Sequence, residues 1–238
     1  MHILVIDGGH VEVEFREKFG PGHEYSFLST TYSEVEEWQK LVQQIADEKL
    51  VSDVAFVFGK TERFVSSLAL LNGVQFSIFT DILNQSLAED YLQTDGFTPV
   101  GALIGFCGLP TLLNRPLLEV SLYHEADRQK LAETCAALGT DYRVVADRVG
   151  LVTPRVICQI INEAYFTVQE GTASKADVDL GMKLGTSYPR GPFAWANAIG
   201  VERVYAVLEA LWQDTHDERY KVCPLLKRQA LRGEPFAV

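Results

Sequence analysis

Two places along the chain hold residues whose types could do chemistry. Near the N-terminus, the apolar run His2–Ile6 ends in Asp7-Gly8-Gly9, which is the form of a buried strand that leads into a turn. Glycines in such a turn let the backbone approach a phosphate group and hold it at a helix N-terminus. In the middle of the chain, Cys107 could act as a nucleophile, provided that a base were paired with its thiol.

No paired base for Cys107 is evident from the spacing of the histidines. These are His2, His10, His23, His124 and His216, and they form no recognisable arrangement around the thiol. The four cysteines are widely separated and include no CxxC pair, so we expect no zinc site. We expect all four to be reduced, structural thiols.

The net charge of −11 is concentrated in the N-terminal part of the chain. Residues 1–146 carry 21 acidic and 10 basic side chains, whereas residues 147–238 carry 11 of each. An acidic field of this kind repels nucleic acid, which proteins usually bind through basic patches. It also works against polyphosphate ligands. We therefore expect no nucleic-acid partner.

The first 146 residues alternate strand-like and helix-like runs. The helix-like runs are Ser33–Ile45 and Asp127–Ala137. The strand-like runs are His2–Ile6, Tyr25–Leu28, Asp53–Gly59, Val74–Phe79, Ala102–Phe106 and Leu117–Leu122. Alternation of this kind predicts a mostly parallel sheet flanked by helices, an α/β domain over residues 1–146.

From Asp147 onward the apolar residues follow a helical period. Helices are predicted over Leu151–Val168, from the cap at Ser174 to Gly185, after the turn Pro189–Pro192, and over Val201–Trp212. The fold class is therefore α/β followed by all-α, with the helical domain over residues 147–238. No run of 18 apolar residues is present, and the first residues lack a basic leader, so we expect a cytoplasmic protein without a membrane span.

One series of residues in the helical part resembles a known family. In order, it reads Asn162-Glu163-Ala164, Glu170-Gly171, Asp179-Leu-Gly-Met-Lys-Leu-Gly185 and Pro189-Arg-Gly-Pro-Phe193. This series is similar to the start of the C-terminal domain of 3-hydroxyacyl-CoA dehydrogenases, including 3-hydroxybutyryl-CoA dehydrogenases. The resemblance implies a Rossmann-like NAD-binding domain, here shortened, followed by helices that form a homodimer.

The resemblance allows the NAD-binding turn to be checked by position. The family's GxGxxG pattern places Asp7 at the first glycine, Gly9 at the second and Glu12 at the third, so that Gly8 and Gly9 are the glycines left in the turn. Asp7 puts negative charge where the pyrophosphate should lie, and Glu12 adds bulk where helix and strand should pack. The acid that binds the ribose should fall near Ser29 or Thr30, and neither is acidic. We expect no tightly bound cofactor, and NAD follows only from the resemblance. The plainer interpretation of Asp7-Gly8-Gly9 is a tight turn from strand to helix.

The catalytic positions implied by the resemblance are also changed. Counting back from Glu119-Val120 without gaps puts Cys107 where the family has its histidine general base, while Glu119, which orients that histidine, is kept. The family's Val-Asn-Arg becomes Thr153-Pro154-Arg155, so Pro154 replaces an asparagine that holds the substrate. A thiol does not replace an imidazole well, because an imidazole has a pKa near about 6.5 and takes up and returns a proton at neutral pH.

Three functions remain open at this point. The first is a noncatalytic member of the family, kept as a dimeric binding or scaffold protein for an acyl-CoA or small acidic ligand. The second is an active NAD-dependent 3-hydroxyacyl-CoA dehydrogenase of fatty-acid or butanoate metabolism with a rearranged site. The third is another enzyme that acts on a different acyl-CoA or small acid through Cys107 as nucleophile.

Overall fold

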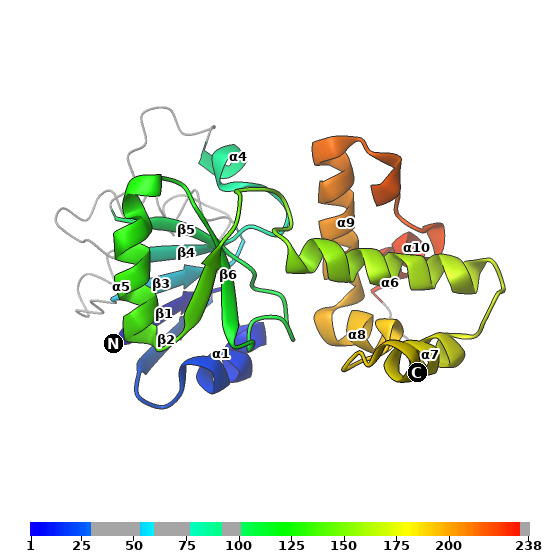
Figure 1. Ribbon diagram of the computed structural model, residues 1–238, viewed down its shortest axis with the longest axis horizontal. Helices are drawn as coiled ribbons and strands as arrows, with labels where there is room; N and C mark the ends of the chain where they lie inside the picture. The colour runs from blue at the N-terminus through cyan, green and yellow to red at the C-terminus, as the bar shows by residue number, and fades with distance from the viewer. Residues whose placement is uncertain (30–52, 60–76, 92–100, 234–238) are drawn as a thin grey trace. The chain divides into compact units, whose positions relative to one another are not determined.

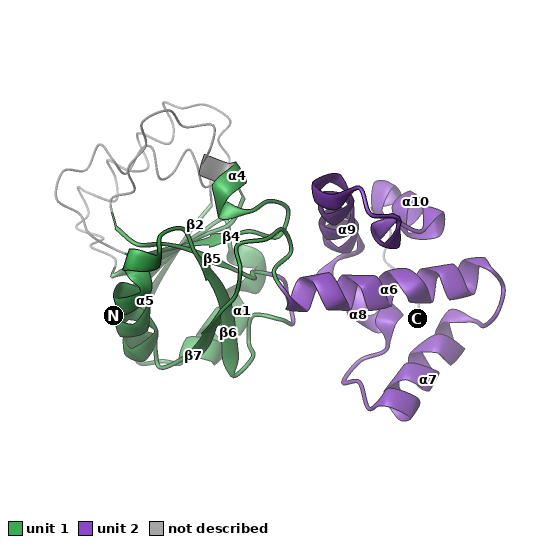
Figure 2. Cartoon of the chain, turned by 45° about the horizontal axis from the view of Figure 1, so that its top comes forward, with its two compact units in different colours: residues 1–108, 112–151 green, residues 109–111, 152–238 purple. Residues whose placement is uncertain are grey.

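The computed structural model describes residues 1–29, 53–59, 77–91 and 101–233 of the 238-residue chain (Figure 1). The chain divides into two compact units, one of Met1–Gly108 with Leu112–Leu151, the other of Leu109–Thr111 with Val152–Val238 (Figure 2). The helix predicted over Ser33–Ile45, and Thr30 of the expected ribose contact, lie outside the described residues.

The first unit is built on a seven-stranded sheet with the order β2-β1-β3-β4-β5-β6-β7. Its strands are β1 (His2–Ile6), β2 (Glu24–Leu28), β3 (Val54–Val57), β4 (Ser77–Asp81), β5 (Leu103–Phe106), β6 (Leu117–Leu122) and β7 (Asp141–Val144). Neighbouring strands are parallel except β5 and β6, which pair antiparallel. The predicted mostly parallel α/β sheet is thus confirmed.

Helices α1 (Glu12–Phe19) and α5 (Arg128–Leu138) pack on this sheet, and the short α4 (Leu87–Tyr91) follows β4. Alternate residues of the strands form one hydrophobic cluster with apolar side chains of α1 and α5. Aromatic rings fill much of it: Phe56 lies between Phe15 of α1 and Phe79 of β4, with ring centroids 4.9 and 4.7 Å away. The central strands are short and apolar on both faces, and their core residues are fully buried.

The second unit is helical and consists of α6 (Thr153–Gln169), α7 (Lys175–Thr186), α8 (Pro192–Ile199), α9 (Val201–Thr215), the 3-10 turn Glu218–Tyr220 and α10 (Pro224–Arg232). The four predicted helices are present, and α10 is an addition. The Ser174 cap is confirmed, because Ser174 Oγ accepts a hydrogen bond from Asp177 N at 3.2 Å. Helix α7 ends at Thr186, one residue beyond the predicted Gly185, because Ser187 takes up the left-handed conformation (φ 57°).

Candidate functional site

The turn between β1 and α1 is tight. Asp7 directly follows β1 at φ 57°, and its N–H donates to Leu28 O at 2.8 Å. Gly8 is buried, and a Cβ on it would come within 2.4 Å of Val5 Cγ1 and 2.5 Å of Phe58 Cε2. Gly9 is exposed, and a Cβ there would meet nothing within 4 Å. Packing therefore requires a glycine at position 8, because the side chains of Val5 and Phe58 lie against its backbone.

Glu12 begins α1 and lies on the surface of that helix. Its carboxylate accepts hydrogen bonds from Arg16 Nε at 2.9 Å and Arg16 Nη2 at 2.8 Å, one turn further on. The expected obstruction between helix and strand is therefore not formed by Glu12, since its side chain is half-exposed and paired with Arg16. Ser29, at the end of β2, is exposed and carries no charge.

Cys107 and Glu119 are brought together by the pairing of β5 with β6. Phe106 pairs with Val120, and Cys107 follows Phe106 while Glu119 precedes Val120 on the neighbouring strand. The two residues therefore lie at the same end of this antiparallel pair. Cys107 is 5% exposed, and the next strand places Arg143 beside Glu119 in register. The position of Cys107 is thus opposite that of Glu119, the residue that the resemblance assigns to orienting a base.

Pro154 lies in the first turn of α6 in the second unit, buried and without an N–H to donate. Proline is well suited to this position, because the first N–H groups of a helix have no partner within it. The neighbouring Arg155 is engaged within its own unit. Its Nη1 donates to Tyr220 OH at 2.6 Å, and its guanidinium lies 5.4 Å from the centre of the Tyr220 ring.

Two residues of the family-like series, Asn162 and Asp179, form hydrogen bonds that join separate segments of the helical unit. The buried Asn162 donates to Lys221 O at 3.0 Å and accepts from Cys223 N at 2.8 Å, which ties α6 to the segment before α10. Asp179 accepts from Phe193 N at 2.7 Å and Ala194 N at 2.9 Å, and so caps α8 from α7. These roles could not be assigned from spacing alone, because each joins segments far apart in the sequence.

Comparison with known proteins places this helical unit in a family. Residues 150–235 match the family model described as "3-hydroxyacyl-CoA dehydrogenase, C-terminal domain". The helical unit therefore carries a C-terminal domain of the 3-hydroxyacyl-CoA dehydrogenase type. The bonds of Asn162 and Asp179 explain in physical terms why this part of the family pattern is retained.

Among the relatives, 3-hydroxyadipyl-CoA dehydrogenase of Escherichia coli (strain K12) is 42% identical over 87 residues, which are 37% of this chain and 18% of that protein. A probable 3-hydroxybutyryl-CoA dehydrogenase of Bacillus subtilis (strain 168) is 39% identical over 89 residues, which cover 37% of this chain and 31% of that protein. The matched segment thus spans less than a third of either of these relatives.

Solved structures of the family match nearly the whole chain in fold. FadB2 of M. tuberculosis superposes with a TM-score of 0.72 at 16% identity, covering 97% of this chain and 93% of that one. The (S)-3-hydroxybutyryl-CoA dehydrogenase PaaH1 of Ralstonia eutropha gives a TM-score of 0.67 at 20% identity, with 98% and 94% covered. The N-terminal unit therefore shares its fold with these structures.

Family homologues are NAD-dependent dehydrogenases, and two residues of the β1–α1 turn bear on whether that cofactor fits this chain. Asp7 carries a carboxylate where a pyrophosphate would need positive charge or N–H donors. Gly8, in the same turn, is covered by the ring of Phe58.

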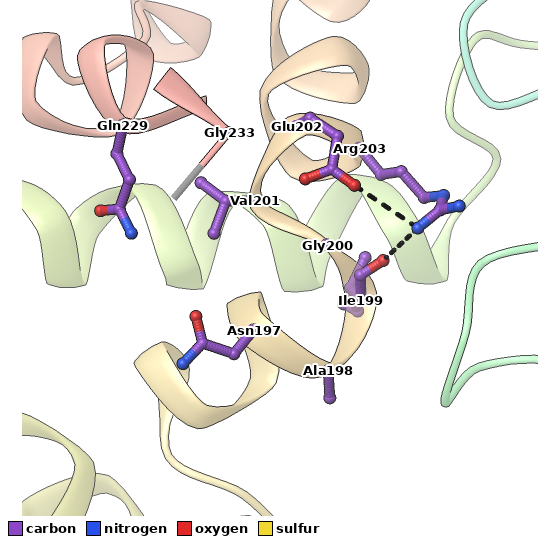
Figure 3. Close-up of a pocket in the computed structure, with 9 residues that line it drawn as sticks. All are labelled: Asn197, Ala198, Ile199, Gly200, Val201, Glu202, Arg203, Gln229 and Gly233. Carbon is purple, nitrogen blue, oxygen red and sulfur yellow. Dashed lines mark hydrogen bonds and ion pairs between the residues drawn. The ribbon is translucent and has the colours of Figure 1, made fainter. Parts of the chain in front are cut away.

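The helical unit contains a small cavity of about 260 Å³ at the junction of α8 and α9 (Figure 3). Asn197, Gly200, Arg203, Gln229 and Gly233 are among the residues that line it. Arg203 Nη1 donates to Ile199 O at 3.2 Å and lies 3.5 Å from Glu202 Oε1, so its charge is already offset. The site residues expected from the sequence do not line this cavity.

Burial favours the protonated form of two of the thiols. Burial raises the pKa of Cys158 to about 12, and burial likewise raises that of Cys135 to about 12, with Lys18 acting weakly in the opposite direction. Both therefore stay protonated at neutral pH. No disulfide joins the four cysteines. Within the described ranges, no three His, Cys, Asp or Glu side chains gather as a metal site would need. No helix in these ranges is long and apolar enough to cross a bilayer.

Proposed function

We propose that this chain is a noncatalytic member of the 3-hydroxyacyl-CoA dehydrogenase family, kept as a dimeric binding or scaffold protein. One observation carries the proposal: Cys107, not a histidine, follows β5 at the position opposite Glu119 of β6. In the chemistry of this family, a base must remove the proton of the substrate hydroxyl as hydride leaves the carbon. Cys107 is buried and has a side chain poorly matched to that task at neutral pH.

The other substitutions support the same conclusion independently. Pro154 offers neither a side-chain donor nor an N–H to position a substrate. A positioned general base contributes roughly 10²–10⁴-fold to rate, and residues that act as one unit are lost non-additively. The β1–α1 turn adds an unfavourable carboxylate at Asp7, so weak or absent NAD binding is part of the proposal.

The homodimer is proposed to form through the exposed apolar face of α7. Leu180 and Leu184 lie one turn apart on this helix and are 56% and 76% exposed. On α9, in contrast, Val204, Leu208 and Leu211 are buried within their own unit and cannot supply a free face. Exposed pairs of large apolar side chains are typical of surfaces that associate. The ligand proposed for the assembly is an acyl-CoA or a small acid.

An assay of NADH-linked reduction of acetoacetyl-CoA, followed at 340 nm, tests the proposal. We expect no turnover by the wild type. Turnover of even about 1 s⁻¹, within the ordinary range for enzymes, would overturn it and favour an active dehydrogenase with a rearranged site. Titration with acetoacetyl-CoA by calorimetry then tests whether the acyl-CoA binds without being converted.

A further inference from the structure

Phe58 lies at the point of the sheet where ligands of this fold class bind. The chain runs from β1 outward to β2, and then returns to place β3 on the other side of β1. This reversal creates a crevice outside the carboxyl ends of β1 and β3, where open α/β sheets take up a dinucleotide. Phe58 directly follows β3, and its N–H donates to Ile6 O at the end of β1 with an N to O distance of 3.0 Å.

The ring of Phe58 is held between two glycines. A Cβ on Gly8 would lie 2.5 Å from Cε2 of the ring, and a Cβ on Gly108 would lie 2.2 Å from Cε1 on the opposite edge. Real Cβ atoms do not come so close, so the ring lies directly against both backbones. Phe58 is 5% exposed, and the rings of His10 and Phe106 lie 5.2 and 5.5 Å away by their centres.

We propose that the Phe58 side chain fills this crevice in place of a dinucleotide and closes the N-terminal unit to NAD. The ring lies against the backbone of Gly8, inside the turn that would have to receive a pyrophosphate. Fully packed interiors leave no room for a second occupant without displacement of the first. The inference rests on the proposed loss of NAD binding and names the group that causes it.

A titration of NADH, followed by its fluorescence, separates the ring from the charges. Three proteins are compared: the wild type, the double variant Asp7→Gly/Glu12→Ala, and a triple variant that adds Phe58→Ala to this pair. Glycine suits the φ of 57° at position 7. We expect NADH to bind with a dissociation constant below about 100 µM only in the triple variant. This dissociation constant corresponds to a binding free energy of about 5.5 kcal/mol. Binding by the double variant would overturn the proposal, and so would failure of the triple variant to bind.

A second experiment needs no ligand and measures the melting temperatures of glycine variants. Gly108→Ala should lower the melting temperature by about 5 °C or more in the wild type, because its Cβ meets the ring. In the Phe58→Ala background the same change should cost less than half as much, since Asp81 Cγ at 3.1 Å is then its tightest neighbour. Gly9→Ala, with open space around it, is the matched control and should behave alike in both backgrounds.

Additive effects of Phe58→Ala and Gly108→Ala would show that the ring does not occupy this space, and would overturn the proposal. The outcome is separate from that of the proposed function. Turnover of acetoacetyl-CoA by the wild type would refute the noncatalytic assignment, whereas the melting experiment concerns only what fills the crevice.

Discussion

The carboxylate of Asp179 on α7 lies against Gly191, so close that a Cβ on this glycine would be 2.2 Å from Asp179 Cγ. From there it accepts hydrogen bonds from the N–H groups of Phe193 and Ala194 at the start of α8. The glycine thus makes room for a cap that comes from another helix.

Removing this cap should destabilise the protein. Asp179→Ala leaves two N–H groups at the buried start of α8 without their acceptor, and we expect a loss of about 1–2 kcal/mol in the free energy of unfolding. Gly191→Ala should cost at least as much, because its Cβ would meet the Asp179 backbone at 2.5 Å. Urea unfolding checks both. Lys183→Ala, an exposed change in the same motif, should stay within about 0.5 kcal/mol.

Asn162→Ala should also destabilise the helical unit. The change strands the carbonyl of Lys221 and the N–H of Cys223, and a buried group left without a partner costs about 1–3 kcal/mol. Denaturant unfolding measures this, with the exposed neighbour change Glu163→Ala as control. Equal stability of the two variants would mean that Asn162 does not hold the segment before α10.

Restoring the base alone should not restore activity. Cys107→His places an imidazole beside Glu119, but Pro154 and the closed β1–α1 turn remain. We expect no NADH-linked reduction of acetoacetyl-CoA at 340 nm by this variant. A rate of about 1 s⁻¹ would mean that cofactor binding had survived and that only the base was missing.

The apolar face of α7 should determine the oligomeric state. Leu180→Asp and Leu184→Asp should give soluble monomers, because each places a charge where a second copy is expected to pack. Light scattering at micromolar concentration distinguishes the states. Leu231→Asp is the matched control, since this leucine of α10 is 70% exposed and lies outside the proposed face. A monomeric wild type would contradict the dimer.

The buried thiol of Cys158 should make stability fall at high pH. Burial raises its pKa from 9.0 to about 12 in the folded protein, so the folded state favours the protonated form. The stability that this thiol contributes is complete below pH 9 and is lost as pH rises toward 12. Comparing urea unfolding of wild type and Cys158→Ala at pH 8 and pH 10.5 isolates the effect, which should be absent from the variant. An equal pH dependence in both proteins would refute it.

The sequence predicts most of the sheet because its strands are short apolar runs with sharp ends. His2–Ile6 and Leu117–Leu122 have the same bounds in the structure as in the prediction. Strand β7 was not predicted, since Asp141–Val144 is half-exposed and carries two charged residues. Helix α10 was also not predicted, because Pro224–Arg232 is short and its apolar residues are interrupted by a run of three polar ones, with Leu226 and Gln229 as its buried residues.

The candidate site was predictable only in part. An ungapped count in the sequence puts Cys107 at the position of the family's histidine, and the β5–β6 register makes its position a neighbour of Glu119. The role of Phe58 was not predicted, because it depends on contacts with Gly8 and Gly108, which are separated by 100 positions in the chain. No local pattern in a sequence reports a steric relation of this kind.

A crevice filled by its own side chain has a consequence for how the protein responds to the cell. A ligand that binds the folded state stabilises it in proportion to the logarithm of its concentration, and so couples lifetime to metabolite supply. On the proposal that the ring of Phe58 fills the crevice between Gly8 and Gly108, the N-terminal unit would complete its packing without a nucleotide. Its abundance would then be insensitive to the size and redox balance of the nicotinamide pool.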